Sequence, residues 1–123
     1  GYTKFLDAET FVPANLERLK AAGLFEEDGR VRRVLDIGSG PGYFVSMARL
    51  AGHVAMAMDV PPCRIGTDEG GVVMSKLSNA LDVYPIPHAI KPFVPLPGLG
   101  DIPCRFDIAT MWLMQFPAKK VGE

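Results

Sequence analysis

The sequence predicts an α/β fold built on a doubly wound, mostly parallel sheet. Two observations lead to this prediction. Short apolar runs rich in branched residues alternate with segments of helical spacing, and the first of these runs ends in a group of glycines that opens a helix. Parallel strands need a crossover between them, which is almost always right-handed. We therefore expect a ligand across the carboxyl ends of the first and second strands.

A helical segment is expected within residues 1–30. Apolar residues from Thr10 to Gly23 fall three to four positions apart, and Gly23 itself is a common signal for the end of a helix. Residues 31–123 are interpreted as the core of the fold through its fourth strand. With 123 residues, the chain is expected to form a single domain.

The next three elements predict a βαβ unit. Val31 to Ile37 is a branched apolar stretch, too short for a helix, that ends in glycines. Phe44 to Leu50 has helical spacing, and His53 to Met58 is a second apolar run closed by Asp59. This alternation favours two parallel strands joined by a helix.

Three further elements complete the prediction. Val72 to Leu81 has helical spacing, with Val73, Leu77 and Leu81 on one face. The stretch that follows is rich in proline and leaves only His88 to Lys91 for a short third strand. Phe106 to Met114 is a continuous apolar run and is predicted to be the fourth strand.

The most informative segment is the glycine corner, Gly38 to Gly42, which follows the carboxylate of Asp36. Gly38 and Gly40 allow a sharp turn and close approach to a ligand, and Gly42 allows tight contact at the helix start. The spacing is GxGxG rather than the GxGxxG of dinucleotide sites, which disfavours a pyrophosphate. Asp36 would repel an anion there but attract an ammonium group, so the corner suits a zwitterion.

Asp59 closes the second strand, where an acidic side chain can accept two hydrogen bonds from a ribose diol. The alternative is that this carboxylate only caps a turn. Its position after the glycine corner favours the ribose interpretation.

These motifs together resemble those of class I S-adenosylmethionine-dependent methyltransferases. The resemblance rests on the LDIGSGPG run, the acidic end of the second strand and the later FDIAT run, and it spans most of Val31 to Phe116. It implies that Asp36 reaches the methionyl amino group, that Asp59 holds the ribose hydroxyls and that Val60 packs on adenine. The full set of cofactor-binding residues that it implies is Asp36, Gly38, Ser39, Gly40, Gly42, Asp59, Val60, Thr110 and Met111.

The sequence also departs from that family. Ile90 to Phe93 contains no acidic residue for the adenine amino group, and the fourth strand lacks the Asp/Asn-Pro-Pro-Tyr signature of enzymes that methylate nucleic-acid bases. Counterparts of the fifth strand and of the closing antiparallel pair are not found before Glu123, so the sheet is expected to be incomplete at its C-terminal side. We expect an oligomer or a further segment to cover the open edge.

Composition and charge disfavour several other kinds of function. The net charge of -1 gives no basic stripe for nucleic acid, and the cluster of Arg30, Arg32 and Arg33 is interpreted as a solvated strand entrance. No apolar run is long enough to span a membrane, so a cytoplasmic location is expected. Cys63 and Cys104 have no CxxC spacing, and neither they nor the histidines predict a metal site.

The expected activity is methyl transfer from S-adenosylmethionine to a nucleophilic atom of a small molecule. No catalytic residue is assigned, since no general base is needed for an acceptor that is already nucleophilic. A second hypothesis is a non-catalytic domain that serves as a cofactor-binding or protein-interaction module. A third, an NAD-dependent oxidoreductase, is disfavoured by the glycine spacing.

Overall fold

The structure is a computed structural model that describes residues 6–59, 69–88, 91–94 and 105–112. Within this part of the chain it contains three helices and four strands. In chain order they are α1 (Ala8–Ala21), β1 (Arg33–Ile37), α2 (Tyr43–Leu50), β2 (Val54–Asp59), α3 (Glu69–Ala80), β3 (Ile86–Pro87) and β4 (Ile108–Met111).

The four strands form one parallel sheet in the order β3-β2-β1-β4. The strands β1, β2 and β3 follow one another across the sheet, whereas β4 lies on the other side of β1. The strand order therefore reverses between β1 and β4, and such a reversal is where open α/β sheets bind their ligands. In the register, Asp36 of β1 is opposite Ala57 of β2 on one side and Thr110 of β4 on the other.

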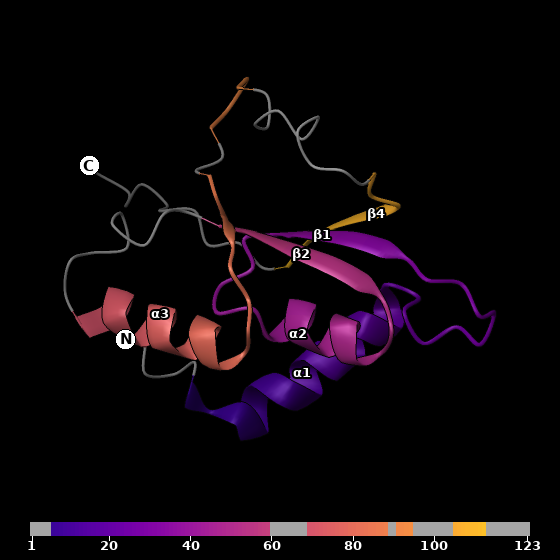
Figure 1. The fold of residues 1–123 in the computed structure, drawn as a ribbon, viewed down its shortest axis with the longest axis horizontal. Helices are drawn as coiled ribbons and strands as arrows, with labels where there is room; N and C mark the ends of the chain where they lie inside the picture. The colour runs from indigo at the N-terminus through magenta and orange to yellow at the C-terminus, as the bar shows by residue number, and fades with distance from the viewer. Residues whose placement is uncertain (1–5, 60–68, 89–90, 95–104, 113–123) are drawn as a thin grey trace, which may run out of the picture.

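The described helices all lie on one face of the sheet (Figure 1). Two of them, α2 and α3, connect strands that advance in the same direction, so right-handed crossovers place both on the same side. Most of the connection from β3 to β4 lies outside the described residues. The prediction of an α/β fold with a parallel sheet is confirmed. In the described ranges a second helical layer is not seen.

Alternation along β1 divides the core between the two faces of the sheet. Val34 faces the helices and packs with Leu19, Phe44 and Val45, whereas Leu35 and Ile37 pack with Met58 on the opposite face. Asp36 is two residues after Val34 in the strand, so its carboxylate points to the same face, the side covered by the helices. A polar group is thus buried between apolar layers at the end of β1.

The first helix begins two residues earlier than predicted because of its cap. Asp7 accepts hydrogen bonds from the backbone N–H and the hydroxyl of Thr10, at 3.3 and 2.7 Å, and the helix therefore begins at Ala8. At its other end Gly23 has a φ of +74°, and the N–H of Leu24 donates to the carbonyl of Leu19 at 3.0 Å. This is the Schellman arrangement that glycine favours, as the sequence predicted for the helix end.

The predicted position of the third strand is wrong. Strand β3 is formed by Ile86 and Pro87, which pair with Met58 and Asp59, whereas the prediction began at His88. A proline is tolerated because β3 is the outermost strand of the described sheet, and the N–H of His88 completes the pairing by donating to the carbonyl of Asp59 at 2.7 Å. Residues 89–90 lie outside the described part.

The remaining boundaries differ by a few residues. Strand β1 begins at Arg33 rather than Val31, which is 60% exposed and too solvated for a buried strand. Helix α3 buries Met74 and Ser78, one position away from the predicted face, while Leu77 and Leu81 are half-buried. Strand β4 spans Ile108–Met111, and the last two residues of the predicted run are outside the described ranges.

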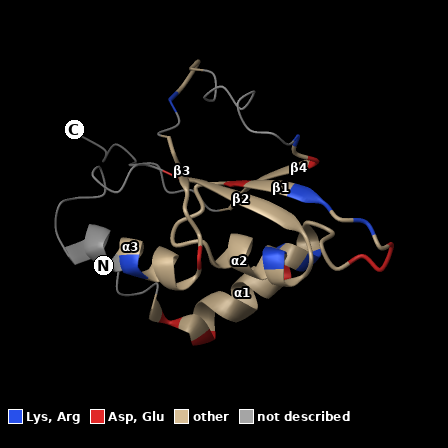
Figure 2. Cartoon of the chain, in the orientation of Figure 1, with Lys and Arg blue, Asp and Glu red and all other residues tan. Residues whose placement is uncertain are grey.

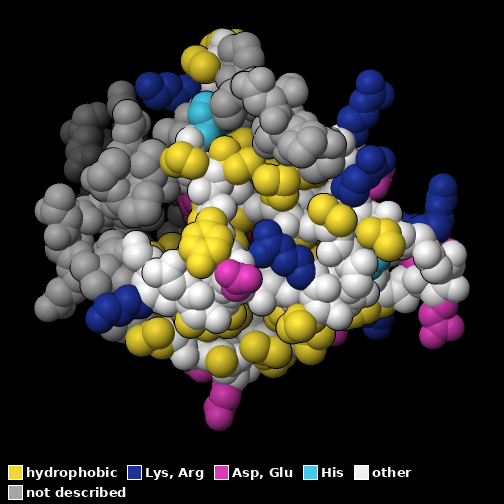
Figure 3. All heavy atoms as spheres, viewed as in Figure 1, with side chains coloured by type: hydrophobic (Ala, Val, Ile, Leu, Met, Phe, Trp, Pro, Cys, Tyr) yellow, Lys and Arg dark blue, Asp and Glu magenta, His cyan; other side chains and the backbone are white. Residues whose placement is uncertain are grey.

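Charged side chains of both signs are interspersed over the surface (Figures 2 and 3). The arginines at the entrance of β1 have acidic partners: Arg32 pairs with Asp28 at 2.8 Å and Arg33 with Asp107 at 3.1 Å. Exposed pairs of this kind contribute little stability, but they neutralise two of the three arginines of the cluster. None of the helices in the described ranges has the length and apolar character needed to cross a membrane.

Candidate functional site

The glycine corner connects β1 to α2 and is anchored to β2. Gly38, Gly40 and Gly42 have φ values of +72°, +57° and +103°, in the left-handed region that other residues rarely adopt. The N–H groups of Gly38 and Ser39 donate to the carbonyl of Met58, at 2.8 and 3.2 Å. The sequence therefore needs glycine at all three positions in order to fold the corner against the neighbouring strand.

Gly42 caps α2 and is more closely packed than Gly40, around which a Cβ atom would meet nothing within 4 Å. A Cβ atom built on it would lie 2.6 Å from Cγ1 of Val83, in the segment between α3 and β3. The tight contact predicted at the helix start is confirmed, and its partner is Val83. Gly42 thus allows the corner between β1 and α2 to pack against the segment between α3 and β3.

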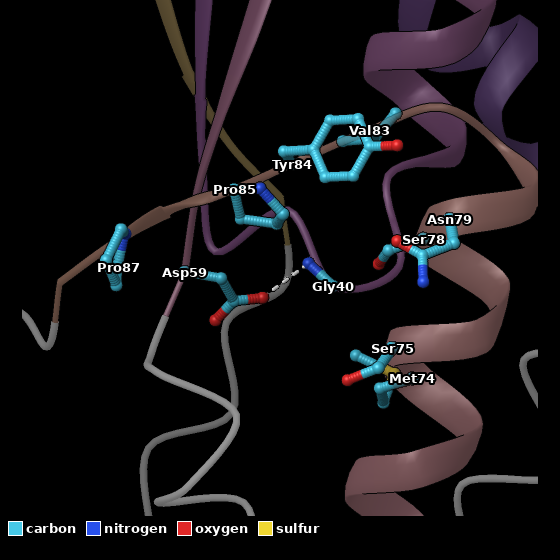
Figure 4. Close-up of a pocket in the computed structure, with 10 residues that line it drawn as sticks. All are labelled: Gly40, Asp59, Met74, Ser75, Ser78, Asn79, Val83, Tyr84, Pro85 and Pro87. Atoms are coloured by element: carbon cyan, nitrogen blue, oxygen red, sulfur yellow. Dashed lines mark hydrogen bonds between the residues drawn. The ribbon is translucent and has the colours of Figure 1, made fainter.

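Asp59 lies at the carboxyl end of β2 and bonds to the corner. Its Oδ2 accepts a hydrogen bond from the N–H of Gly40 at 2.6 Å (Figure 4). The side chain borders a pocket of about 230 Å³ between the corner, α3 and the segment leading into β3. The pocket is lined by Gly40, Asp59, Met74, Ser75, Ser78, Asn79, Val83, Tyr84, Pro85 and Pro87.

The pocket combines apolar walls with a few polar groups. Met74, Val83 and the two prolines supply the apolar surface, and Figure 4 shows the Tyr84 ring at one side of it. Ser78 is buried, and its hydroxyl donates to the carbonyl of Pro41 at 3.1 Å, which ties α3 to the corner. A carboxylate beside apolar walls can accept hydrogen bonds from ligand hydroxyls while a flat ring contacts the walls.

Asp36 forms a second polar centre at the junction of β1 and β4. It is only 2% exposed, and Oδ1 accepts a 2.6 Å hydrogen bond from the hydroxyl of Thr110. Burial raises the pKa of Asp36 to about 6, although the Thr110 hydrogen bond and the charge of Arg18 oppose the shift and the charge of Asp59 adds to it. A perturbed carboxyl at the strand-order reversal is a common property of binding and catalytic sites.

The predicted site residues are only partly brought together. Gly40 and Asp59 line the pocket, whereas Asp36 is turned toward Thr110 and does not line it. Met111, opposite Ile37 in the register, is 52% exposed. Val60 lies outside the described residues, so its predicted contact stays a prediction.

Sequence reasoning missed most of the pocket wall. Four of its residues come from α3, namely Met74, Ser75, Ser78 and Asn79. They belong to no motif, and their only signal was helical spacing, which indicates a face but not what that face packs against. Pro85 and Pro87 fall in the stretch that the sequence predicts to be loop, and they border the pocket because β3 begins earlier than expected.

Some buried polar atoms at the site have no hydrogen-bond partner in the described part of the chain. They include the Ser39 hydroxyl in the corner and the indole Nε1 of Trp112, just after β4. Buried polar groups are nearly always paired in folded proteins, so these two atoms are candidates for contact with a ligand. Within the same ranges, no group of three or more His, Cys, Asp or Glu side chains is arranged to hold a metal ion.

Comparison of the chain with protein-family models, with curated proteins and with solved structures finds no match.

Proposed function

We propose that this chain binds S-adenosylmethionine and transfers its methyl group to a small-molecule acceptor, as a class I methyltransferase domain. The observation that carries the proposal is the hydrogen bond between the Asp59 carboxylate and the N–H of Gly40, two residues that line a pocket. This bond joins the acidic end of β2 to the GxGxG corner, and both are features on which the sequence resemblance rests.

The pocket beside Asp59 suits the nucleoside half of this cofactor. A carboxylate accepts hydrogen bonds from the vicinal hydroxyls of an unphosphorylated ribose, and it repels a phosphate. Apolar walls from Met74, Val83 and Pro85 offer contact to the adenine ring. A dinucleotide fits less well, because its pyrophosphate would lie close to two carboxylates.

The buried carboxylate of Asp36 suits the amino-acid half. With a pKa of about 6 it is mostly ionised at neutral pH, although burial disfavours that charge. An ammonium group bound beside it would offset the cost of burial. The Ser39 hydroxyl, buried without a partner in the described ranges, supplies a further polar contact from the corner.

Catalysis on this proposal is chiefly positional. S-adenosylmethionine, when bound, supplies an electrophilic methyl group on a sulfonium centre. The chain holds the two ends of the cofactor at Asp36 and Asp59 and fixes the direction of the methyl group toward the acceptor. Thr110 and Met111, at the end of β4, border the place where the acceptor would approach. No side chain is assigned as a general base.

Calorimetric titration with S-adenosylhomocysteine tests this proposal. Wild-type protein, shown to be folded by its helical circular dichroism, is expected to bind the ligand with a stoichiometry of one and to bind NAD more weakly. Absence of binding at high micromolar ligand would contradict the proposal. Tighter binding of NAD would instead favour an oxidoreductase.

A non-catalytic cofactor-binding module is the second candidate. The observation that favours it is the position of β4, which pairs only with β1 among the described strands and leaves its other edge without a strand partner there. An open edge of this kind can bind another chain. A stable oligomer that binds S-adenosylhomocysteine, yet transfers no radiolabelled methyl group to any of a panel of small acceptors, would support the module over the enzyme.

A further inference from the structure

Three groups of complementary chemistry meet where β1 and β4 end. Arg18 projects from α1, and its guanidinium carbon lies 5.7 Å from the centre of the Trp112 ring. That ring also contacts Phe44 of α2, at 5.6 Å between ring centres. Arg18 is close enough to Asp36 for its charge to lower the pKa of that carboxyl. A cation, an indole and a buried carboxylate therefore share one end of the sheet.

Two donors in this group lack strong acceptors. The indole Nε1 of Trp112 is buried and has no partner in the described part of the chain, an arrangement that destabilises a folded protein. For Arg18 the structure gives one hydrogen bond, to Oδ1 of Asn15 at the long distance of 3.5 Å. The ion pairs of the described residues involve other arginines. An anionic ligand group would satisfy both donors.

We propose that Arg18 and the indole N–H of Trp112 bind the α-carboxylate of the cofactor's methionine moiety. This assignment rests on the proposed function and extends it to a helix outside the glycine corner. In an α-amino acid the ammonium and the carboxylate are bonded to the same carbon, so the groups that bind them must adjoin. Asp36 receives the ammonium, and Arg18 supplies the opposite charge next to it.

The chemistry of the two donors matches a carboxylate. A guanidinium forms charge-assisted and often bidentate hydrogen bonds with carboxylates, and these are stronger than neutral ones. The Trp112 ring beneath Arg18 restricts the guanidinium through a cation–π contact, which lowers the entropy lost on binding. Because the indole N–H is buried away from water, a hydrogen bond from it to the ligand would be stronger than the same bond at the surface.

Binding of two probes to matched variants tests the assignment. S-adenosylhomocysteine carries the amino acid, whereas 5'-methylthioadenosine keeps the nucleoside and lacks both the ammonium and the carboxylate. The variant Arg18→Gln is expected to bind S-adenosylhomocysteine at least tenfold more weakly and 5'-methylthioadenosine within twofold of wild type. Trp112→Phe, which keeps the ring and removes the N–H, should show the same selectivity with a smaller loss. Lys20→Gln, an exposed change on the same helix, is the control and should alter neither affinity.

Decarboxylated S-adenosylhomocysteine separates the two charges of the amino acid. Arg18→Gln should bind it as wild type does, whereas Asp36→Asn should bind it more weakly. Wild-type affinity of Arg18→Gln for S-adenosylhomocysteine would overturn the assignment, and so would an equal loss for all probes, which indicates a structural role. If wild-type protein bound none of the probes, the proposed function itself would fail and the assignment with it.

Discussion

The hydroxyl of Thr110 donates a 2.6 Å hydrogen bond to Oδ1 of Asp36, and both side chains are buried at the point where the strand order reverses. The two residues are register partners on neighbouring strands, 74 positions apart in the sequence. The bond favours the ionised form of a carboxylate that burial disfavours. The ionised carboxylate of Asp36 therefore destabilises the fold unless a positively charged group binds beside it.

Replacing Asp36 with Asn should stabilise the fold at neutral pH. Folded Asp36, with a pKa of about 6 against an ordinary value of 3.8, holds its proton more tightly than the unfolded chain does. The stability that its proton provides is fully present below pH 3.8 and is lost as the pH rises through about 6. Asn keeps the acceptor for Thr110 and removes the charge, so the free energy of unfolding at pH 7 should rise by about 1–3 kcal/mol.

Urea denaturation at two pH values checks this prediction. The gain of Asp36→Asn over wild type should be present at pH 7 and nearly absent at pH 4. Glu17→Gln, an exposed charge removal on α1, serves as the control and should stay within about 0.5 kcal/mol of wild type at both values. An Asp36→Asn variant that is less stable than wild type at pH 7 would show that the buried charge of Asp36 does not destabilise the fold.

Thr110→Val should destabilise the protein, because Val fills a similar volume but cannot donate to Asp36. The carboxylate would lose the hydrogen bond that lowers its pKa, so the pKa should rise further above 6. We expect a loss of about 1–3 kcal/mol at pH 7 and a smaller loss at pH 4, measured by urea denaturation. Thr110→Ser, which keeps the hydroxyl, should lose less. Equal stability of the Val and Ser variants would argue against the bond.

Gly42→Ala should be among the most damaging small substitutions in the chain. The new Cβ would lie 2.6 Å from Val83 at a backbone φ of +103°, so both sterics and conformation oppose it. We expect a loss of more than about 2 kcal/mol, seen as a lower thermal midpoint. Gly29→Ala is the matched control: its φ is +68°, nothing lies within 4 Å of the new atom, and the loss should be about 1 kcal/mol. Similar losses for the two would contradict the close packing.

Asp59→Asn should separate structure from binding. The Asn oxygen can still accept the hydrogen bond from Gly40, so the thermal midpoint should change little. Without the carboxylate charge, hydrogen bonds to a ribose diol weaken, and affinity for S-adenosylhomocysteine should fall at least tenfold by calorimetry. An unchanged affinity would indicate that Asp59 only supports the corner.

The sequence was sufficient for the elements whose local signals are strong. The short apolar runs of β1 and β2 and the glycines at positions 38, 40 and 42 predicted the parallel core and the corner, and in the structure these three glycines have positive φ. The predicted third strand is wrong because proline ordinarily disfavours a strand, whereas Pro87 is tolerated since β3 is outermost in the described sheet. That position is a tertiary property which local patterns do not contain.

The site was predictable only where a motif fixed the residue. Asp59 and Gly40 follow from spacing, and they do meet. The pocket wall from α3 and the pairing of Asp36 with Thr110 depend on helix packing and strand order, which connect positions far apart in the sequence. Arg18 carried no signal in the sequence, because a charged residue on a helix is ordinarily solvated.

An amide ¹H–¹⁵N correlation spectrum, recorded during titration with S-adenosylhomocysteine, tests the central claim most directly. The account predicts saturable shifts at the amides of Gly38, Ser39 and Gly40 and at Asp59, with little change at Gly29, which lies in the irregular segment before β1. A folded protein whose glycine-corner amides stay unchanged at millimolar ligand would contradict it.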